Sequence, residues 1–295
     1  MQSTLKISAR NAGQVELAKY CPRCAWYLFR LKKMPFQMGM PGVMFYLEQC
    51  EKAFILAHLE KYQKLPKDFG VFSRCTQPVE FPFRMSAEHK ASGVILTAQV
   101  DMMLRLPDGK IALIDLKTAK SEGGGAMFHP QYEIQLIGYS WVTEAAEIGE
   151  VGRAGLIFCE IDNDLFKDEP LAHSNEDGIV VPFHFTAHPV ALDFDRLTKC
   201  LKEMNRVWNE PRPPQGAENC KDCALLTRLF DFESQMRSND AASATLSRDG
   251  CNALVCEEYK RSVARGSYQN LQDVLRTDDG LANDGGMWAN WDFTE

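Results

Sequence analysis

The sequence predicts an α/β fold in which a mixed central sheet is flanked by helices. Two apolar, strand-like runs at 93–106 and 110–117 surround a tight turn, which is the pattern of a β-hairpin. Helices are expected at 45–62 and 191–208 from apolar residues at helical spacing, and at 130–146, where a proline suits the first turn. Strands that alternate with helices favour a sheet covered by helices.

The hairpin turn sets a register that brings charged residues together. The turn LPDGK at 106–110 suits a three-residue loop, because proline pre-sets the first turn position and glycine takes the left-handed one. Counting outward from this turn places Asp101 opposite Asp115. Lys117 shares their face because strand side chains alternate. A loop one residue longer or shorter would place Asp101 opposite a different residue.

The two opposed carboxylates are the strongest functional indication in the chain. Charged groups within strand-like runs are costly unless they are paired or bind a metal. A divalent cation between Asp101 and Asp115 would remove their repulsion, because hard cations take oxygen ligands. We therefore expect a metal site here, with Lys117 beside it.

Length, charge and hydropathy limit the number of domains, the kind of binding partner and the location that we expect. The chain has 295 residues, enough for one or two domains, and a net charge of −7. The acidic excess lies mostly in residues 268–295, so a local basic groove elsewhere remains compatible with nucleic acid. No apolar run approaches the about 20 residues that cross a bilayer, and no signal peptide is recognisable, so we expect a cytoplasmic protein without membrane contact.

Cysteine usage points to a second metal site. Ten cysteines without a secretion signal favour metal binding over disulfides. The pairs Cys21-x-x-Cys24 and Cys220-x-x-Cys223 could supply four thiolates that clamp distant segments together. Spacing alone does not decide between Zn²⁺ and an iron–sulfur cluster.

Three features together resemble the PD-(D/E)xK nuclease superfamily, particularly its RecB-like branch, which includes the CRISPR-adaptation nucleases. They are Asp101, the triplet Asp115-Leu116-Lys117 and the QLIGY run at 135–139, which is similar to the RecB-type QLxxY motif. The resemblance covers residues 15–225. It implies a restriction-endonuclease-like fold, closed here by the four-cysteine clamp.

The resemblance also implies separate roles for these residues. Asp101 and Asp115 would hold Mg²⁺ or Mn²⁺. Lys117 would orient the attacking water or offset charge at the phosphate. Gln135 and Tyr139 would share a helix face and position the lysine or the DNA strand.

The superfamily often takes a further acid from the helix before the hairpin. Glu48 is the first choice for this metal ligand and catalytic residue, with Glu51 second and His58 third. This segment lacks the glycine–histidine motif of many relatives, and Asp115 stands where many carry glutamate.

From this resemblance we expect a metal-dependent DNA nuclease, an exonuclease on DNA ends or single strands. The four cysteines would hold a [4Fe–4S] cluster, with Zn²⁺ as the alternative. The implied partners are DNA and a helicase, recombination or CRISPR-adaptation protein. The alternative function is a non-catalytic DNA-binding or assembly module that retains the fold. We expect a nuclease domain at 1–235, a polar linker with a short helix at 236–267 and an acidic, disordered tail at 268–295.

Overall fold

The structure is a computed structural model that describes residues 4–32, 42–122, 128–161, 174–175, 178–179 and 181–248. The predicted acidic tail lies outside these residues. The chain divides into two compact units, one formed by Met1–Met34 with Met40–Ala217 and the other by Pro35–Gly39 with Glu218–Glu295. The two units are described separately.

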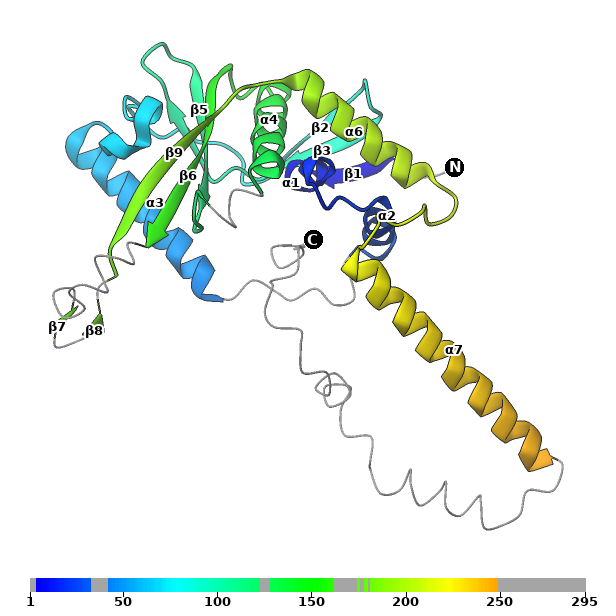
Figure 1. Cartoon of the computed structure of the whole chain (residues 1–295). Helices are drawn as coiled ribbons and strands as arrows, with labels where there is room; N and C mark the ends of the chain where they lie inside the picture. The colour runs from blue at the N-terminus through cyan, green and yellow to red at the C-terminus, as the bar shows by residue number, and fades with distance from the viewer. Residues whose placement is uncertain are drawn as a thin grey trace. The chain divides into compact units, whose positions relative to one another are not determined.

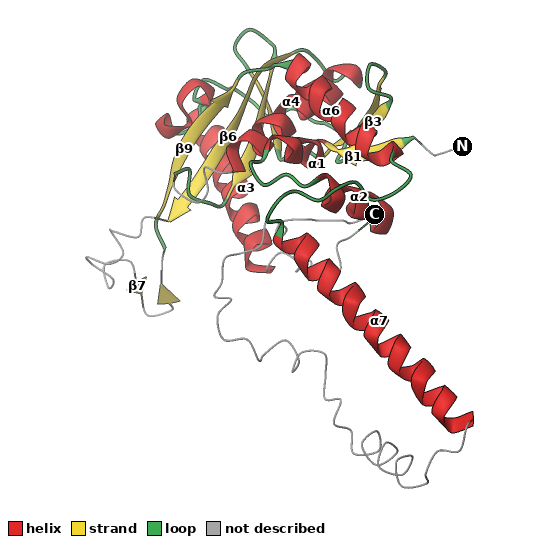
Figure 2. Ribbon diagram, turned by 45° about the vertical axis from the view of Figure 1, so that its right-hand side comes forward, coloured by secondary structure: helices red, strands yellow, loops and turns green. Residues whose placement is uncertain are grey.

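The first unit contains two mixed sheets, which confirms the predicted α/β class (Figures 1 and 2). One sheet has the order β1-β3-β2 and the other has the order β4-β5-β6-β9. In the larger sheet β5 and β6 run parallel, whereas β4 and β9 are antiparallel to their neighbours. The strands are β1 (Leu5–Ser8), β2 (Met85–His89), β3 (Val94–Ala98), β4 (Met102–Arg105), β5 (Ile111–Lys117), β6 (Val151–Ile161), β7 (Ser174–Asn175), β8 (Gly178–Ile179) and β9 (Phe183–Val190).

Helices cover these sheets at positions close to those expected from the sequence. The predicted helices at 45–62, 130–146 and 191–208 correspond to α3, α4 and α6. The helices and 3-10 turns of this unit are α1 (Ala9–Ala12), η1 (Gly13–Glu16), α2 (Pro22–Leu31), α3 (Gly42–Tyr62), η2 (Lys67–Phe72), α4 (His129–Ala145) and α6 (Phe194–Asn209).

The larger sheet is buried on both faces, between α3 and α4 (Figure 1). Along β5, Leu113 packs in one apolar cluster with Ile134 of α4, and its neighbour Ile114 packs in the other with Ile55 of α3. Burial on both sides explains why β5 is a nearly continuous apolar run. Asp115, which shares the α4 face with Leu113, is therefore a carboxylate inside a core strand.

The predicted hairpin register is confirmed along β4. Met103 pairs with Leu113, and the Leu106 N–H donates a hydrogen bond to the Lys110 carbonyl at 2.9 Å. Gly109 has a φ of +86°, the left-handed conformation that the loop requires of this residue.

The prediction of one continuous strand at 93–106 is wrong. β3 ends at Ala98 in the smaller sheet, and β4 begins at Met102 in the larger one. The ladder with β5 therefore stops one residue short of Asp101. The physical reason is that Oδ2 of Asp101 accepts a hydrogen bond from the Leu116 N–H at 2.9 Å, so a side chain takes the place of a backbone carbonyl.

The second unit contains the helix α7 (Lys221–Arg248). This helix continues through residues 236–248, which composition assigns to a polar linker. A helix can itself serve as a linker, so the boundary at residue 235 stays a prediction. Among the described residues no helix is long and apolar enough to span a membrane.

Candidate active site

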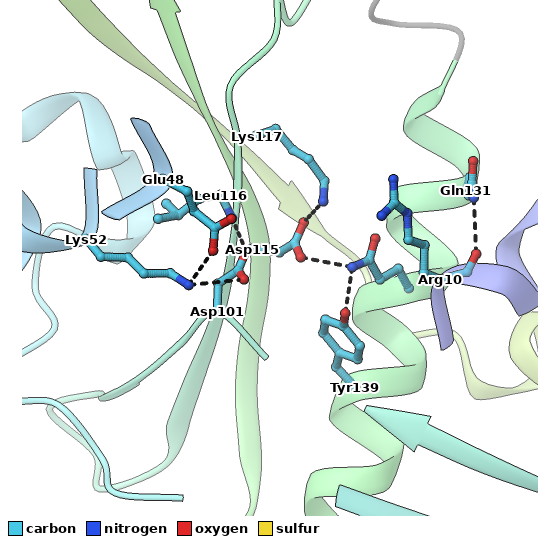
Figure 3. A network of polar contacts seen from close by, with 10 residues as sticks. Arg10, Glu48, Lys52, Asp101, Asp115, Leu116, Lys117, Gln131 and Tyr139 are labelled. Atoms are coloured by element: carbon cyan, nitrogen blue, oxygen red, sulfur yellow. Dashed lines mark hydrogen bonds and ion pairs between the residues drawn. The ribbon is translucent and has the colours of Figure 1, made fainter. Parts of the chain in front are cut away.

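Asp115 is the most buried charged group of the candidate site. Its residue surface is 2% exposed, and Nε2 of Gln135 donates a hydrogen bond to its Oδ1 at 3.0 Å. The Lys117 ammonium group forms an ion pair with Oδ2 (Figure 3). Burial raises the pKa of Asp115, Lys117 opposes the rise and Asp101 adds to it, so that the pKa is about 6. Asp115 is thus a carboxylate whose charge depends on nearby cations.

Gln135 and Tyr139 support this carboxylate from α4. Nε2 of Gln135 also donates to the Tyr139 hydroxyl at 2.7 Å, so one amide group holds two buried oxygens. Burial, together with the charge of Asp115, raises the pKa of Tyr139 and keeps the hydroxyl protonated. The two α4 residues lie one helical turn apart, as the QLxxY spacing predicts, and both are buried.

Asp101 meets a second group of charges from α3. Nζ of Lys52 lies 2.6 Å from Oε1 of Glu48 and 3.4 Å from Oδ1 of Asp101 (Figure 3). Burial alone would lower the pKa of Lys52, but Asp101 and Glu48 raise it. Sequence reasoning missed this lysine, although its position one turn after Glu48 was a usable signal. Lys52 acts here as a counter-charge between the two carboxylates.

Glu51 and His58, the other two helix candidates, have different surroundings. Glu51 is 6% exposed; the Thr118 hydroxyl donates to its Oε1 at 2.8 Å, and its Oε2 has no hydrogen-bond partner among the described residues. Burial raises the pKa of Glu51. His58 instead lies 2.8 Å from the Lys64 carbonyl and packs beside the Tyr62 ring. Both glutamates therefore lie near the site, while the contacts of His58 are with other residues.

Lys117 is held in place by an aromatic ring that sequence reasoning also missed. Its Nζ lies 4.5 Å from the ring centroid of Tyr132, on α4. A cation over a ring face is attracted by the negative charge of that face. Tyr132 precedes Gln135 by about one helical turn, so the two residues support Lys117 and Asp115 from the same side of α4.

The donor set suits a hard divalent cation. Asp101, Asp115 and the two α3 glutamates offer oxygen atoms, and one of these, Oε2 of Glu51, is buried without a partner. Mg²⁺ and Mn²⁺ prefer oxygen ligands, and an additional positive charge would offset the proximity of these carboxylates. These residues offer the oxygen ligands that such an ion prefers. Among the described side chains, however, the group of three or more close enough together to hold an ion is Cys21, Cys24, Cys220 and Cys223, so a metal site at the carboxylates stays a prediction.

The four predicted cysteines form a separate cluster. The sulfur atoms of Cys21, Cys24, Cys220 and Cys223 all lie within 4.8 Å of one another and could hold a metal ion. Cys21 is the residue that precedes the first turn of α2, and its Sγ accepts a hydrogen bond from the Ala217 N–H at 3.2 Å.

The sequence matches a protein-family model over most of its length. The sequence model described as "PD-(D/E)XK nuclease superfamily" matches residues 24–228, which is more than half of the chain. The chain belongs to this superfamily. Membership implies nuclease-type hydrolysis with nucleic acid as the substrate, and nucleases of the superfamily usually use divalent metals.

The comparisons with solved structures and with curated proteins carry no argument about function. The solved structure described as "Crystal structure of SSO0001" has 16% sequence identity and a TM-score of 0.37, and the match covers 72% of this chain and 80% of that one. No curated protein matches the chain significantly.

Replacing Gln135 tests whether one side chain holds the buried carboxylate. We expect Gln135→Met to lower the free energy of unfolding by about 1–3 kcal/mol, because Oδ1 of Asp115 and the Tyr139 hydroxyl lose their shared donor. Tyr139→Phe keeps the bond between Gln135 and Asp115 and should cost less, about 1 kcal/mol. Urea denaturation measures both values, and equal stability of all three proteins would contradict this account.

Proposed function

We propose that the protein is a metal-dependent deoxyribonuclease that acts on DNA ends or single strands. The observation that carries the proposal is the arrangement of Asp101, Asp115 and Lys117 at the end of the β4–β5 hairpin. Asp101 accepts a hydrogen bond from the β5 backbone, and Asp115 lies on β5 and pairs with Lys117. The two acids are close enough for the charge of Asp101 to raise the pKa of Asp115. This arrangement is what phosphodiester hydrolysis requires.

The reaction adds a water oxygen to phosphorus and breaks the bond between phosphorus and one sugar oxygen. The water loses a proton, and the departing sugar oxygen takes one up. A divalent cation held by Asp101, Asp115 and a glutamate of α3, with Glu48 as first choice and Glu51 as second, would activate the water and offset the phosphate charge.

The side chains of the site have complementary tasks in this reaction. Lys117 orients the water and offsets charge that develops on the phosphate, and Tyr132 holds its ammonium group in place. Gln135, braced by Tyr139, fixes the orientation of the Asp115 carboxylate. Because these supporting residues come from one helix, the geometry does not depend on a flexible loop.

For the cysteine cluster we propose a [4Fe–4S] cofactor, with Zn²⁺ as the alternative. Four buried or half-buried sulfur atoms within 4.8 Å of one another suit either group. A cofactor there would clamp α2 to the segment that begins at Cys220, so its role is structural and separate from the hydrolytic site.

The second candidate function is a non-catalytic module that binds or assembles on DNA. Lys52 favours this alternative, because its ammonium group already neutralises Glu48 and Asp101 without a metal ion. In either case the partner would be a helicase, recombination or CRISPR-adaptation protein. Cleavage activity separates the two functions directly.

The decisive experiment incubates end-labelled single- and double-stranded DNA with the protein and Mg²⁺ or Mn²⁺. We expect cleavage by the wild type and a loss of about 10²–10³-fold in rate for Lys117→Ala, because a group that offsets transition-state charge is removed. Lys110→Ala is the matched control, since Lys110 pairs with Glu150 at the opposite end of β5 and should keep full activity.

Two results would go against this proposal. Binding without cleavage under all metal conditions would favour the non-catalytic module. Full activity of a folded Lys117→Ala protein would remove the role assigned to that lysine.

The cofactor proposal has its own test. Anaerobically purified protein should be brown, with a broad visible absorbance band and bound iron, and Cys21→Ser should lose both the colour and much of the stability. Cys50→Ser is the control, because Cys50 is exposed and outside the cluster. Colourless protein with stoichiometric zinc would reject the iron–sulfur choice but keep the cysteine site, and metal-free folded protein would reject both.

A further inference from the structure

Arg10 is a cation near the candidate site that has no task in the proposed reaction. It lies in α1 and is half-buried. Its backbone carbonyl accepts a hydrogen bond from Nε2 of Gln131 at 3.2 Å, but among the described residues its guanidinium group has no hydrogen bond or ion pair. A partly desolvated charge without a partner is costly, and a bound anion would remove that cost.

Tight packing between α1 and α4 fixes the position of Arg10. Gly138 of the QLIGY run is so close to α1 that a Cβ atom there would lie 2.6 Å from Cβ of Ala9. A Cβ atom on Gly13, which follows α1, would clash with the Gln131 carbonyl oxygen. At the start of α1, Oγ of Ser8 caps the helix by accepting from the Asn11 N–H at 3.2 Å. These contacts hold Arg10 against the helix that supports Asp115.

The charge of Arg10 reaches the catalytic carboxylate. It opposes the rise that burial causes in the pKa of both Asp115 and Tyr139. In Figure 3 its guanidinium group extends along the same side of α4 as the Lys117 ammonium group. Lys117 is already paired with Asp115, whereas Arg10 is not committed to a carboxylate.

Arg30 shows what a structural arginine looks like in this protein. It donates to the carbonyls of Trp208 and Glu210 at 3.0 and 3.2 Å, and it stacks over the Trp26 and Trp208 rings. These donors are occupied within the fold. The guanidinium donors of Arg10, in contrast, remain available for a ligand.

We propose that Arg10 binds a phosphate group of the nucleic-acid strand, next to the phosphate that Lys117 approaches. The planar guanidinium fork matches two phosphate oxygens at once, which an ammonium group cannot do. This inference rests on the proposed nuclease function and adds a substrate-binding residue to the site. Because Arg10 belongs to α1 and Lys117 to β5, the strand would lie across the end of the hairpin and against α4.

The first test measures kcat and KM of Arg10 variants on end-labelled single-stranded DNA with Mg²⁺. We expect Arg10→Ala to lower kcat/KM by about 10- to 100-fold, the range for one charge-assisted hydrogen-bonding group, with an unchanged melting temperature. Arg10→Lys should recover part of the loss, because it restores charge but not the fork. Arg105→Ala is the control, since Arg105 donates to the Gly109 carbonyl in the distant hairpin turn.

A second readout separates phosphate binding from a structural role. Single phosphates of the DNA are replaced in turn by neutral methylphosphonate, and affinity is measured by fluorescence anisotropy without Mg²⁺ or Mn²⁺. At the phosphate that Arg10 contacts, the substitution should weaken the wild type but leave Arg10→Ala almost unaffected, because both changes remove the same interaction.

Several outcomes would overturn the inference. Unchanged kinetics of Arg10→Ala, or additive losses at every phosphate, would show that Arg10 does not bind the strand. A lowered melting temperature with no effect specific to one phosphate would assign Arg10 a structural role. If the wild type cleaves no DNA at all, the proposed function fails; an active wild type that is indifferent to Arg10 rejects this inference alone.

Discussion

The site depends on the burial of one carboxylate, Asp115, inside a strand that is covered on both faces. A charge in that position is costly unless it is paired, and the structure supplies Lys117 on one oxygen and Gln135 on the other. Together these contacts explain why Lys117, Gln135 and Tyr139 occur where they do. Burial, opposed in part by Lys117, leaves the pKa of Asp115 raised to about 6. A cation bound at this carboxylate would favour its charged form.

Asp101, the second acid, lies just outside the hairpin, because β4 begins only at Met102. If β4 continued through Asp101, the backbone carbonyl of another residue would accept from the Leu116 N–H. Instead the Asp101 side chain accepts it, so the carboxylate lies at the end of the ladder, where Lys52 approaches from α3. Asp101 is therefore contacted from the α3 side and Asp115 from the α4 side.

Local chemistry explains which features the sequence could predict. The turn at 106–110 sets the hairpin register through its own residues, so the proximity of Asp101 and Asp115 could be inferred from chain position alone. The split of the predicted strand at 93–106 was missed because it depends on a side chain replacing a backbone partner. Arg10 was missed for a related reason: it reaches the site through packing of α1 against α4, which are distant in sequence, and periodicity does not report such packing. Lys52 was missed although its position one turn after Glu48 was a usable signal.

Manganese binding tests the central claim most directly, because it reports on the carboxylates without requiring catalysis. Free Mn²⁺ is measured by electron paramagnetic resonance during titration of the wild type, Asp101→Asn and Asp115→Asn, with Asp108→Asn in the hairpin turn as the matched control. The account predicts binding by the wild type and the control, and a clear loss of affinity in both site variants. Equal Mn²⁺ affinity in the Asp115→Asn protein, or no binding by the wild type, would contradict it.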